Sequence, residues 1–362
     1  MGLATPTSIM VGTGRAAEMG VLFRQGDALQ TLQEARVLVF DKTGTLTQGR
    51  PQVVDEWFAS SADAEQRQFV RAACAVLESR SEHPLAEAVQ AWSSAQALAL
   101  PSVQDFESVT GCGLSARVAG QQVCIGAFRW MQSLNIDTGG AEAVMQRWSN
   151  QGRSHIWVAV EGQLVAGLAV SDVLKPEAKA TVHALQRQGL RVVMLSGDHA
   201  ASVQHVCEAL GLDEAMAEVM PHDKAAMVQA LQAKWGSVAF VGDGINDAPA
   251  LAQADVGIAM GTGTDVAVEA AQVVLMSGDL RGVVDALAIS RSTLRNIRQN
   301  LFWAFAYNAM LIPVAAGALY PSTGWMLSPI LASAAMAMSS VFVLSNALRL
   351  RWFATHRVSE AM

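Results

Sequence analysis

The sequence predicts an α/β protein in which a doubly wound sheet is interrupted by an α+β domain and followed by membrane helices. Apolar runs at residues 37–40 and 238–241 each stop abruptly at Asp and Gly, as parallel strands do where they enter a ligand-binding loop. A long stretch of different pattern separates these runs. Two apolar stretches close the chain, and 51% of all residues are hydrophobic against 16% charged.

The composition limits the class of protein. A chain of 362 residues is expected to form two or three domains. Its mean hydropathy of +0.27 is high for a soluble enzyme, so part of it is expected in lipid. A net charge of −7 without any basic run excludes a nucleic-acid partner. The four cysteines lack CxxC spacing and are interpreted as reduced core residues: Cys74, Cys112, Cys124 and Cys207.

The first predicted strand ends in the heptapeptide DKTGTLT, which begins at Asp41. A carboxylate at the carboxyl end of a parallel strand is held rigidly and faces the ligand. Lys42 adds a positive charge, and Thr43 and Gly44 supply a hydroxyl and free backbone N–H groups that suit phosphate oxygens. Asp41 is therefore the candidate nucleophile for forming an aspartyl-phosphate. A polar turn that caps the next element would also explain the heptapeptide alone.

A second polar group follows the strand at residues 238–241. Asp243, Asn246 and Asp247 are packed between glycines there, and such oxygen ligands suit a hard cation. We expect Asp243 to bind Mg²⁺ beside Asp41 and the Thr43 carbonyl, with Asp247 and Asn246 holding the surrounding shell. A tight turn would explain the glycines but not the acids.

A third loop, at residues 196–198, follows the strand at 192–195. Its Ser196 hydroxyl can donate a hydrogen bond to a phosphate oxygen, and Gly197 follows it at the ligand-facing edge of the sheet. Asp198 either orients the loops or caps the following helix, and the cap is the favoured interpretation.

The DKTGTLT motif resembles the phosphorylation motif of P-type ATPases, ion pumps whose catalytic domain is haloacid-dehalogenase-like. Soluble phosphatases of that superfamily usually carry a second Asp two positions after the nucleophile, and Thr43 stands there instead. Its absence fits a pump, whose phosphoenzyme must persist. The resemblance also implies that Lys224 neutralises the transferred phosphate. The expected catalytic residues are Asp41, Lys42, Thr43, Ser196, Lys224 and Asp247.

The middle of the chain resembles the nucleotide-binding domain of heavy-metal pumps. SEHPL at residues 81–85 matches their signature, which implies that His83 and Glu78 contact the adenine end of ATP. Gly111 and Gly113 match the family's Gly-x-Gly, whereas Ala127 stands where Asn is usual. Without the resemblance, a helix start at Pro84 and a β-turn would explain both segments. The expected ATP-binding residues are Glu78, His83, Gly111, Gly113, Gly197 and Asp198.

Two apolar segments, residues 301–320 and 327–348, are each long enough to cross roughly 30 Å of hydrocarbon. Basic residues stand before the first and after the second, and the connection between them is uncharged. The positive-inside rule then places both outer ends in the cytoplasm. We expect an integral membrane protein of the plasma (inner) membrane, with its catalytic domains in the cytosol.

Polar residues inside these segments bear on the transported ion. The first carries Tyr307 and Asn308, and the second carries Met336, Ser339 and Ser340. Methionine sulfur favours copper(I), although helix–helix hydrogen bonding and space filling explain the same residues equally well. The pattern resembles the copper(I)-exporting subclass, and the absence of an intramembrane carboxylate or Lys disfavours zinc, calcium and protons. Silver is not separated from copper.

These observations predict the following division of the chain. Residues 1–26 form half of a transmembrane helix and a linker, 27–51 and 165–285 the phosphorylation domain, 52–164 the nucleotide-binding domain, 286–352 a transmembrane hairpin and 353–362 a tail. The expected function is the catalytic and carboxyl-terminal part of an ATP-driven copper(I) export pump. Its expected cofactors are ATP and Mg²⁺, and its partners are copper(I), the lipid bilayer and, in a full-length pump, a copper chaperone.

Two motifs of complete pumps, a Cys-Pro-Cys triplet and a Thr-Gly-Glu actuator loop, do not occur in the sequence. The polypeptide alone is therefore expected to bind ATP and to be incapable of transport. Three alternatives are a free phosphatase, a non-catalytic nucleotide-binding remnant, and a pump for silver or another soft metal.

Overall fold

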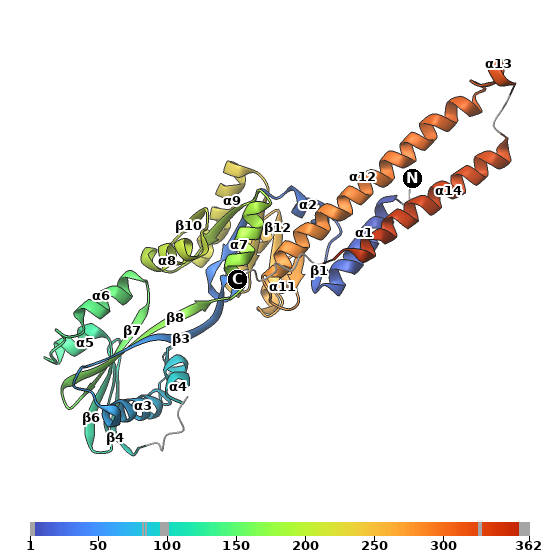
Figure 1. Cartoon of the computed structure of the whole chain (residues 1–362). Coiled ribbons are helices and arrows are strands. Elements are labelled where there is room, and N and C mark those ends of the chain that lie inside the picture. The colour runs from blue at the N-terminus through green and yellow to red at the C-terminus, as the bar shows by residue number, and fades with distance from the viewer. Residues whose placement is uncertain (1–3, 82, 84, 95–100, 325–327, 355–362) are drawn as a thin grey trace.

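The computed structural model describes residues 4–81, 83, 85–94, 101–324 and 328–354. Two sheets and a pair of long projecting helices organise this part of the chain (Figure 1). The seven-stranded sheet has the order β1-β13-β12-β11-β2-β9-β10, and only its β1–β13 pair is antiparallel. Its strands are β1 (Val21–Phe23), β2 (Val37–Asp41), β9 (Arg191–Leu195), β10 (Glu214–Met216), β11 (Val238–Gly242), β12 (Val256–Met260) and β13 (Val273–Leu275).

The seven-stranded sheet is buried on both faces. Along β2, Leu38 and Phe40 pack into one core cluster, whereas Val37 and Val39 pack into another on the opposite face. This alternation confirms the predicted doubly wound α/β fold. The helices around the sheet are α2 (Ala28–Glu34), α7 (Ala178–Arg187), α8 (Ala200–Leu210), α9 (Lys224–Trp235), α10 (Ala248–Gln253) and α11 (Asp265–Ala270).

The edge strand β1 differs from the prediction, which placed it in a linker. Residues Val21–Phe23 pair antiparallel with Val273–Leu275 and complete the sheet. A strand of three residues is too short to show a periodic pattern, so it could not be predicted from the sequence.

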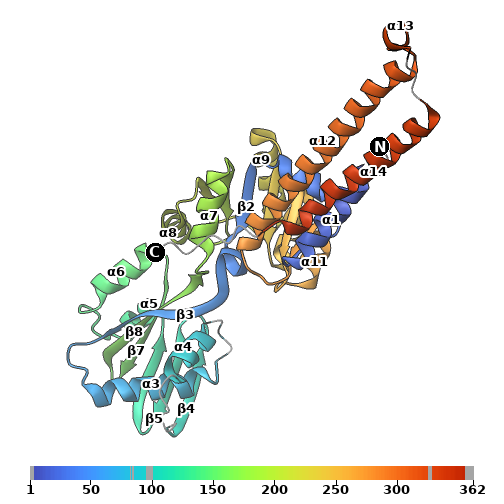
Figure 2. The same ribbon diagram turned by 45° about the vertical axis from the view of Figure 1, so that its right-hand side comes forward.

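The six-stranded sheet lies between β2 and β9 in the sequence and is antiparallel throughout, with the order β3-β8-β7-β6-β5-β4. Its strands are β3 (Thr47–Phe58), β4 (Val103–Val109), β5 (Gly113–Val118), β6 (Gln121–Gly126), β7 (Ser154–Val160) and β8 (Gln163–Leu174). Helices α3 (Ala64–Glu78), α4 (Ala86–Ser94), α5 (Phe128–Ser133) and α6 (Glu142–Asn150) accompany it. The long strands β3 and β8 lead to and from the other sheet (Figure 2).

The domain boundary that we predicted at residues 49–51 falls within strand β3. Strand β3 runs through Gly49 and Pro51 without a break in its assignment and pairs with β8, with a register shift between Thr47 and Pro51. β3 is an edge strand of its sheet, where a missing backbone N–H is tolerated, so Pro51 does not end it. Strand β4 was also not anticipated.

The projecting helices are α12 (Arg281–Ala315) and α14 (Pro329–Leu348), with α13 (Tyr320–Thr323) near the tip and η4 (Arg349–Trp352) at the base (Figures 1 and 2). α12 is one 35-residue helix that begins against the sheet, so the first predicted membrane segment is only its outer end. Helix α1 (Ala4–Glu18) packs against α12, where a side-chain carbon at Gly12 would come within 2.3 Å of the Thr293 hydroxyl.

Within these described ranges, one helical segment, Pro329–Trp352, is long and apolar enough to cross a membrane. The prediction of a second segment of this kind at residues 301–320 is therefore not met in the described residues. α12 ends at Ala315, and Tyr307 and Asn308 lower the hydropathy of its outer end. Large apolar side chains are nevertheless exposed on both helices, among them Phe302, Phe305 and Ile330.

Candidate active site

A cavity of about 420 Å³ opens at the carboxyl ends of β2, β9 and β11. Since β2 lies between β9 and β11 in the sheet, the three loops predicted to carry chemistry converge there. The first residue of α9, Lys224, completes the wall. The cavity is lined by Asp41, Thr43, Gly44, Ser196, Gly197, Asp198, Lys224, Asp243, Asn246 and Asp247, among others.

The Lys224 ammonium lies between two carboxylates. Its Nζ atom donates to Asp41 Oδ1 at 2.5 Å and to Asp247 Oδ1 at 2.7 Å. All three residues are at most 6% exposed. Asp247 is fixed further because its Oδ2 atom accepts from the backbone N–H groups of Asp243 at 3.2 Å and Gly244 at 3.0 Å. One cation therefore holds the candidate nucleophile against the loop that follows β11.

Burial and charge shift the titration of this cluster. Burial and the negative charge of Asp247 raise the pKa of Asp41 to about 7, although Lys224 offsets part of the effect. Burial lowers the pKa of Lys224, but the charges of Asp41 and Asp247 outweigh it, and the net shift is upward. Burial and Asp247 also raise the pKa of Asp243. The cluster thus holds more negative charge than Lys224 alone compensates.

The donor set of this cavity fits Mg²⁺. Carboxylate oxygens of Asp41, Asp243 and Asp247 all lie within 4.8 Å of one another, and a divalent cation prefers such hard oxygen ligands. Gly44 leaves the space for this approach. Its φ is +74°, and a side-chain carbon there would lie 2.0 Å from Asp243 Oδ2. The predicted pairing of Asp41 with the distant Asp243 is therefore present in the fold.

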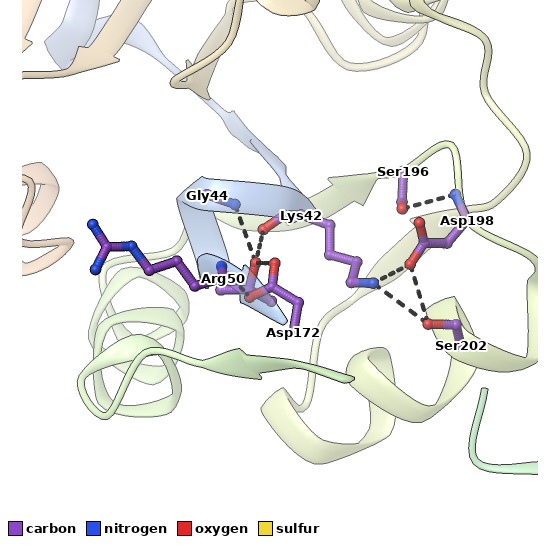
Figure 3. A network of polar contacts seen from close by, with 8 residues as sticks. Lys42, Gly44, Arg50, Asp172, Ser196, Asp198 and Ser202 are labelled. Carbon is purple, nitrogen blue, oxygen red and sulfur yellow. Dashed lines mark hydrogen bonds and ion pairs between the residues drawn. The ribbon is translucent and has the colours of Figure 1, made fainter. Parts of the chain in front are cut away.

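The loop after β9 contacts the nucleophile loop through side chains (Figure 3). The Lys42 ammonium pairs with the Asp198 carboxylate, which also accepts from the Ser202 hydroxyl at 3.2 Å. The favoured capping role of Asp198 is wrong, because its carboxylate caps no backbone N–H of α8. Ser196 is buried, and its oxygen accepts from the Asp198 N–H at 3.1 Å. Gly197 and Asp198, expected near ATP, line this cavity.

Two residues that sequence reasoning left without a role also hold this loop. The Thr47 hydroxyl lies 2.5 Å from Asp172 Oδ2 and accepts from the Gly44 N–H at 3.1 Å. Asp172 also accepts from the backbone N–H of Arg50 at 3.2 Å. Strands β3 and β8 bring these residues together although 125 positions separate them. The sequence signal was an Asp just after an apolar strand, the same signal that identified Asp41.

A second cavity, of about 500 Å³, lies in the domain of the six-stranded sheet. The structure brings four of the expected ATP-binding residues to its wall: Glu78, His83, Gly111 and Gly113. Glu78 is 5% exposed, and burial raises its pKa although a hydrogen bond from Ser81 lowers it in part. The exposed His83 ring accepts the Leu85 N–H at its Nδ1 atom, at 3.2 Å. Glu82 and Pro84 lie outside the described residues.

Glycines bring the strands at this cavity very close together. A side-chain carbon at Gly113 would lie 2.1 Å from the Ile125 carbonyl oxygen, and one at Gly126 would lie 2.3 Å from the Cys112 carbonyl oxygen. The Ala127 N–H donates to that same Cys112 carbonyl at 2.9 Å. Glycine is therefore required by packing at both positions. The sequence reasoning missed His155, which also lines the cavity and whose pKa burial lowers.

The five residues expected to bind the transported metal do not converge on one cavity. Tyr307 and Ser339 share a small apolar cavity between α12 and α14 with Trp303 and Phe342. The Asn308 amide donates to the Ala304 carbonyl of its own helix at 2.7 Å. Met336 is 69% exposed, and the Ser340 hydroxyl donates to the Met336 carbonyl at 3.4 Å.

The fold and the charged cavity define a class of protein, and comparison with known families agrees. The family described as haloacid dehalogenase-like hydrolase matches residues 35–255, which is more than half of the chain, so the chain belongs to this family. This confirms the relationship that DKTGTLT indicated.

The chain is 53% identical over 351 residues to copper-transporting ATPase 2 of Rhizobium meliloti (strain 1021), a match that covers 97% of this chain and 42% of the relative. It is 47% identical over 355 residues to the copper-exporting P-type ATPase of Legionella pneumophila, covering 97% and 47%. The crystal structure of a zinc-transporting PIB-type ATPase in the E2.Pi state matches with a TM-score of 0.87 and 32% identity, covering 96% and 55%. The chain thus spans less than half the length of these curated relatives.

Proposed function

We propose that this chain is the catalytic and carboxyl-terminal membrane part of an ATP-driven copper(I) export pump that forms an aspartyl-phosphate on Asp41. The observation that carries the proposal is the buried contact of Lys224 with Asp41 and Asp247, with Asp243 close by. Such a cluster suits phosphoryl transfer because it positions a nucleophile and neutralises charge in a water-poor site. The P-type ATPases among its relatives support it.

In the proposed reaction ATP occupies the 500 Å³ cavity, with its adenine end at Glu78 and His83, and its triphosphate extends to the other cavity. An oxygen of the ionised Asp41 carboxylate attacks the γ-phosphorus. A phosphorus–oxygen bond forms, the bond from that phosphorus to the β,γ-bridging oxygen breaks, and ADP leaves with the electron pair.

The surrounding side chains stabilise the charge of this transfer. Lys224 lies against Asp41 and can reach the transferring oxygens, while the Ser196 hydroxyl and the backbone N–H groups after Asp41 provide further donors. The Lys42–Asp198 pair and the Thr47–Asp172 contact hold the loop in place. Asp41, Asp243 and the Thr43 carbonyl would hold Mg²⁺, whose charge keeps Asp41 ionised and neutralises the phosphate when bound.

For the membrane part we propose that the outer ends of α12 and α14 lie in the plasma (inner) membrane, with both sheets in the cytosol. The exposed apolar side chains on both helices support this placement. Copper(I) is the proposed cargo because the copper-transporting relatives are more similar in sequence than the zinc-transporting one. The proposed ligands are Tyr307, Asn308, Met336, Ser339 and Ser340, of which Tyr307 and Ser339 already share a cavity, and Met336 would supply the soft sulfur.

Labelling by γ-³²P-ATP in the presence of Mg²⁺ tests the central step. The chain should acquire acid-stable, hydroxylamine-sensitive label, and Asp41→Asn should abolish it. Asp105→Asn is the matched control, since Asp105 is exposed and its backbone φ of +51° is one that Asn adopts readily. Equal labelling of wild-type protein and Asp41→Asn would reject the proposal. Rapid turnover of small phosphate esters without persistent label would favour a phosphatase instead.

A further inference from the structure

Two cavities lie side by side at the base of the helical hairpin and share one residue, Arg295 of α12. The first, of about 280 Å³, is lined by Arg295, Arg291, Arg298 and Gln33. The second, of about 320 Å³, includes Arg349 and Trp352 of η4 in its lining. Their lining residues come mainly from the inner part of α12 and from η4, which follows α14.

No carboxylate among the described residues balances the positive charge of these cavities, and none lines either one. Within the described part of the chain, no ion pair involves any of the arginines there. Arg291 donates to the neutral Gln188 Oε1 at 2.7 Å and Arg349 to the neutral Asn346 Oδ1 at 3.2 Å. Arg295 and Arg298 are exposed.

The apolar surface of the hairpin begins directly beside this basic cluster. Phe302 and Trp303, about one turn beyond Arg298 on α12, are 63% and 52% exposed. Trp352, which lines the second cavity, is 81% exposed. Exposed aromatic side chains next to arginines, just below an apolar band, are typical of the depth at which lipid headgroups lie.

We propose that these cavities are a binding site for the phosphate headgroup of an anionic phospholipid of the cytoplasmic leaflet. Guanidinium groups bind phosphate oxygens in pairs, and two cavities sharing Arg295 offer several such donors around one anion. Trp352 would contact the glycerol region of the same phospholipid beside the cavities. The inference rests on the proposed membrane placement, because only then do headgroups reach this level.

Native mass spectrometry of the full chain released from nanodiscs tests the site, with phosphatidylcholine and phosphatidylglycerol in equal amounts as probes. Wild-type protein should retain phosphatidylglycerol preferentially. Arg295→Gln with Arg298→Gln should weaken that retention about 30-fold, since each basic residue near an anionic surface strengthens binding roughly fivefold. The control Lys179→Gln with Lys234→Gln removes the same charge from exposed positions on α7 and α9 and should retain the lipid. Arg295→Lys with Arg298→Lys should recover part of the binding.

Four results would overturn the proposal. Unchanged phosphatidylglycerol retention in the double Gln variant would show that the arginines do not bind it. Equal loss of both lipids would show that the arginines do not select the anionic headgroup. Displacement of phosphatidylglycerol by inorganic phosphate would assign the cavities to a soluble anion. If wild-type protein retained neither lipid, the membrane placement itself would fail, whereas labelling of Asp41 would be unaffected.

Discussion

The two cavities of the catalytic part differ in chemistry and in construction. The one at the sheet edge is lined by four carboxylates and Lys224. Among the described residues, the one in the inserted domain has Glu78 as its only carboxylate and is otherwise lined largely by glycines, small polar and apolar residues. The first suits making and breaking bonds to phosphorus, and the second suits holding a flat, mostly apolar base. The difference indicates that chemistry and substrate binding are separated between two domains.

Their construction differs as well. Asp41 and Lys224 are 183 positions apart and meet only because the sheet brings their elements together. The second cavity is built largely from neighbouring strands, with Gly113 on β5 paired to Gly126 on β6. Substitutions at the sheet edge should therefore impair phosphorylation in a way that more ATP does not overcome. Substitutions in the inserted domain should be overcome by more ATP.

The largest effect after loss of the nucleophile is expected for Lys224→Met. This change removes the cation between Asp41 and Asp247, so phosphoenzyme formation should slow by about 10²- to 10³-fold. Rapid-quench labelling measures the rate, and equilibrium dialysis should show little change in ATP affinity. Lys234→Met, on the exposed face of the same helix, is the control. A rate close to that of wild-type protein would mean that Lys224 has no part in the transfer.

The next largest effect is expected for Gly44→Ala, which introduces a steric clash. Gly44→Ala places a carbon 2.0 Å from Asp243 Oδ2, so the Asp243 carboxylate must move away and Mg²⁺ should be bound more weakly. We expect labelling to need roughly tenfold or more Mg²⁺, in the range seen when the shell of a metal site is disturbed. Gly120→Ala is the control, because Gly120 also has a positive φ but has open space around it. An unchanged Mg²⁺ requirement in Gly44→Ala would contradict the proposed ligand pair.

Substitutions in the inserted domain should have a different effect, because they should weaken ATP binding and leave phosphoryl transfer unchanged. Glu78→Gln and His83→Ala should each raise the Kd for ATP by about tenfold, the loss expected for one polar contact to a charged group. Labelling at saturating ATP should remain near the wild-type rate. Glu87→Gln, exposed on α4, is the control. A loss of rate that saturating ATP does not restore would show that the two cavities are not separate in function.

The smallest effect concerns stability. The pKa of Asp41 rises from 3.8 to about 7 on folding, so the folded chain binds an extra proton between these values. Without Mg²⁺, protonation of Asp41 therefore adds to the free energy of unfolding at low pH. This contribution is lost as pH rises from about 4 to 7. Thermal unfolding in chelator should show that Asp41→Asn flattens this dependence and raises Tm at pH 7.5 by a few degrees. A steeper dependence in the variant would contradict the shift.

Much of the catalytic site could be predicted from the sequence because its acids directly follow apolar strands. Asp41 and Asp243 were paired on that basis, since the carboxyl ends of parallel strands share one edge. The contact between Thr47 and Asp172 could not be predicted, because it depends on the pairing of β3 with β8 across the whole inserted domain. Likewise, the side-chain partner of Asp198 depends on the direction in which Lys42 leaves its loop.

Other parts of the fold could not be predicted from hydrophobic periodicity or from the positions of Gly and Pro. The three residues of β1 are too few to reveal a period, and Pro51 is tolerated because β3 is an edge strand. From the sequence we also predicted a separate membrane helix that begins near residue 301. The structure instead continues it from Arg281, since no glycine or proline interrupts the helix before Pro313 apart from Gly282 in its first turn.

Chemical mapping of the phosphorylated residue tests the central claim most directly. Borohydride reduces an aspartyl-phosphate to homoserine, so treatment of the ATP-labelled chain followed by peptide mass spectrometry locates the acceptor. The account predicts homoserine at position 41, formed only when both ATP and Mg²⁺ were supplied. Reduction at any other aspartate, or label without homoserine at Asp41, would contradict it.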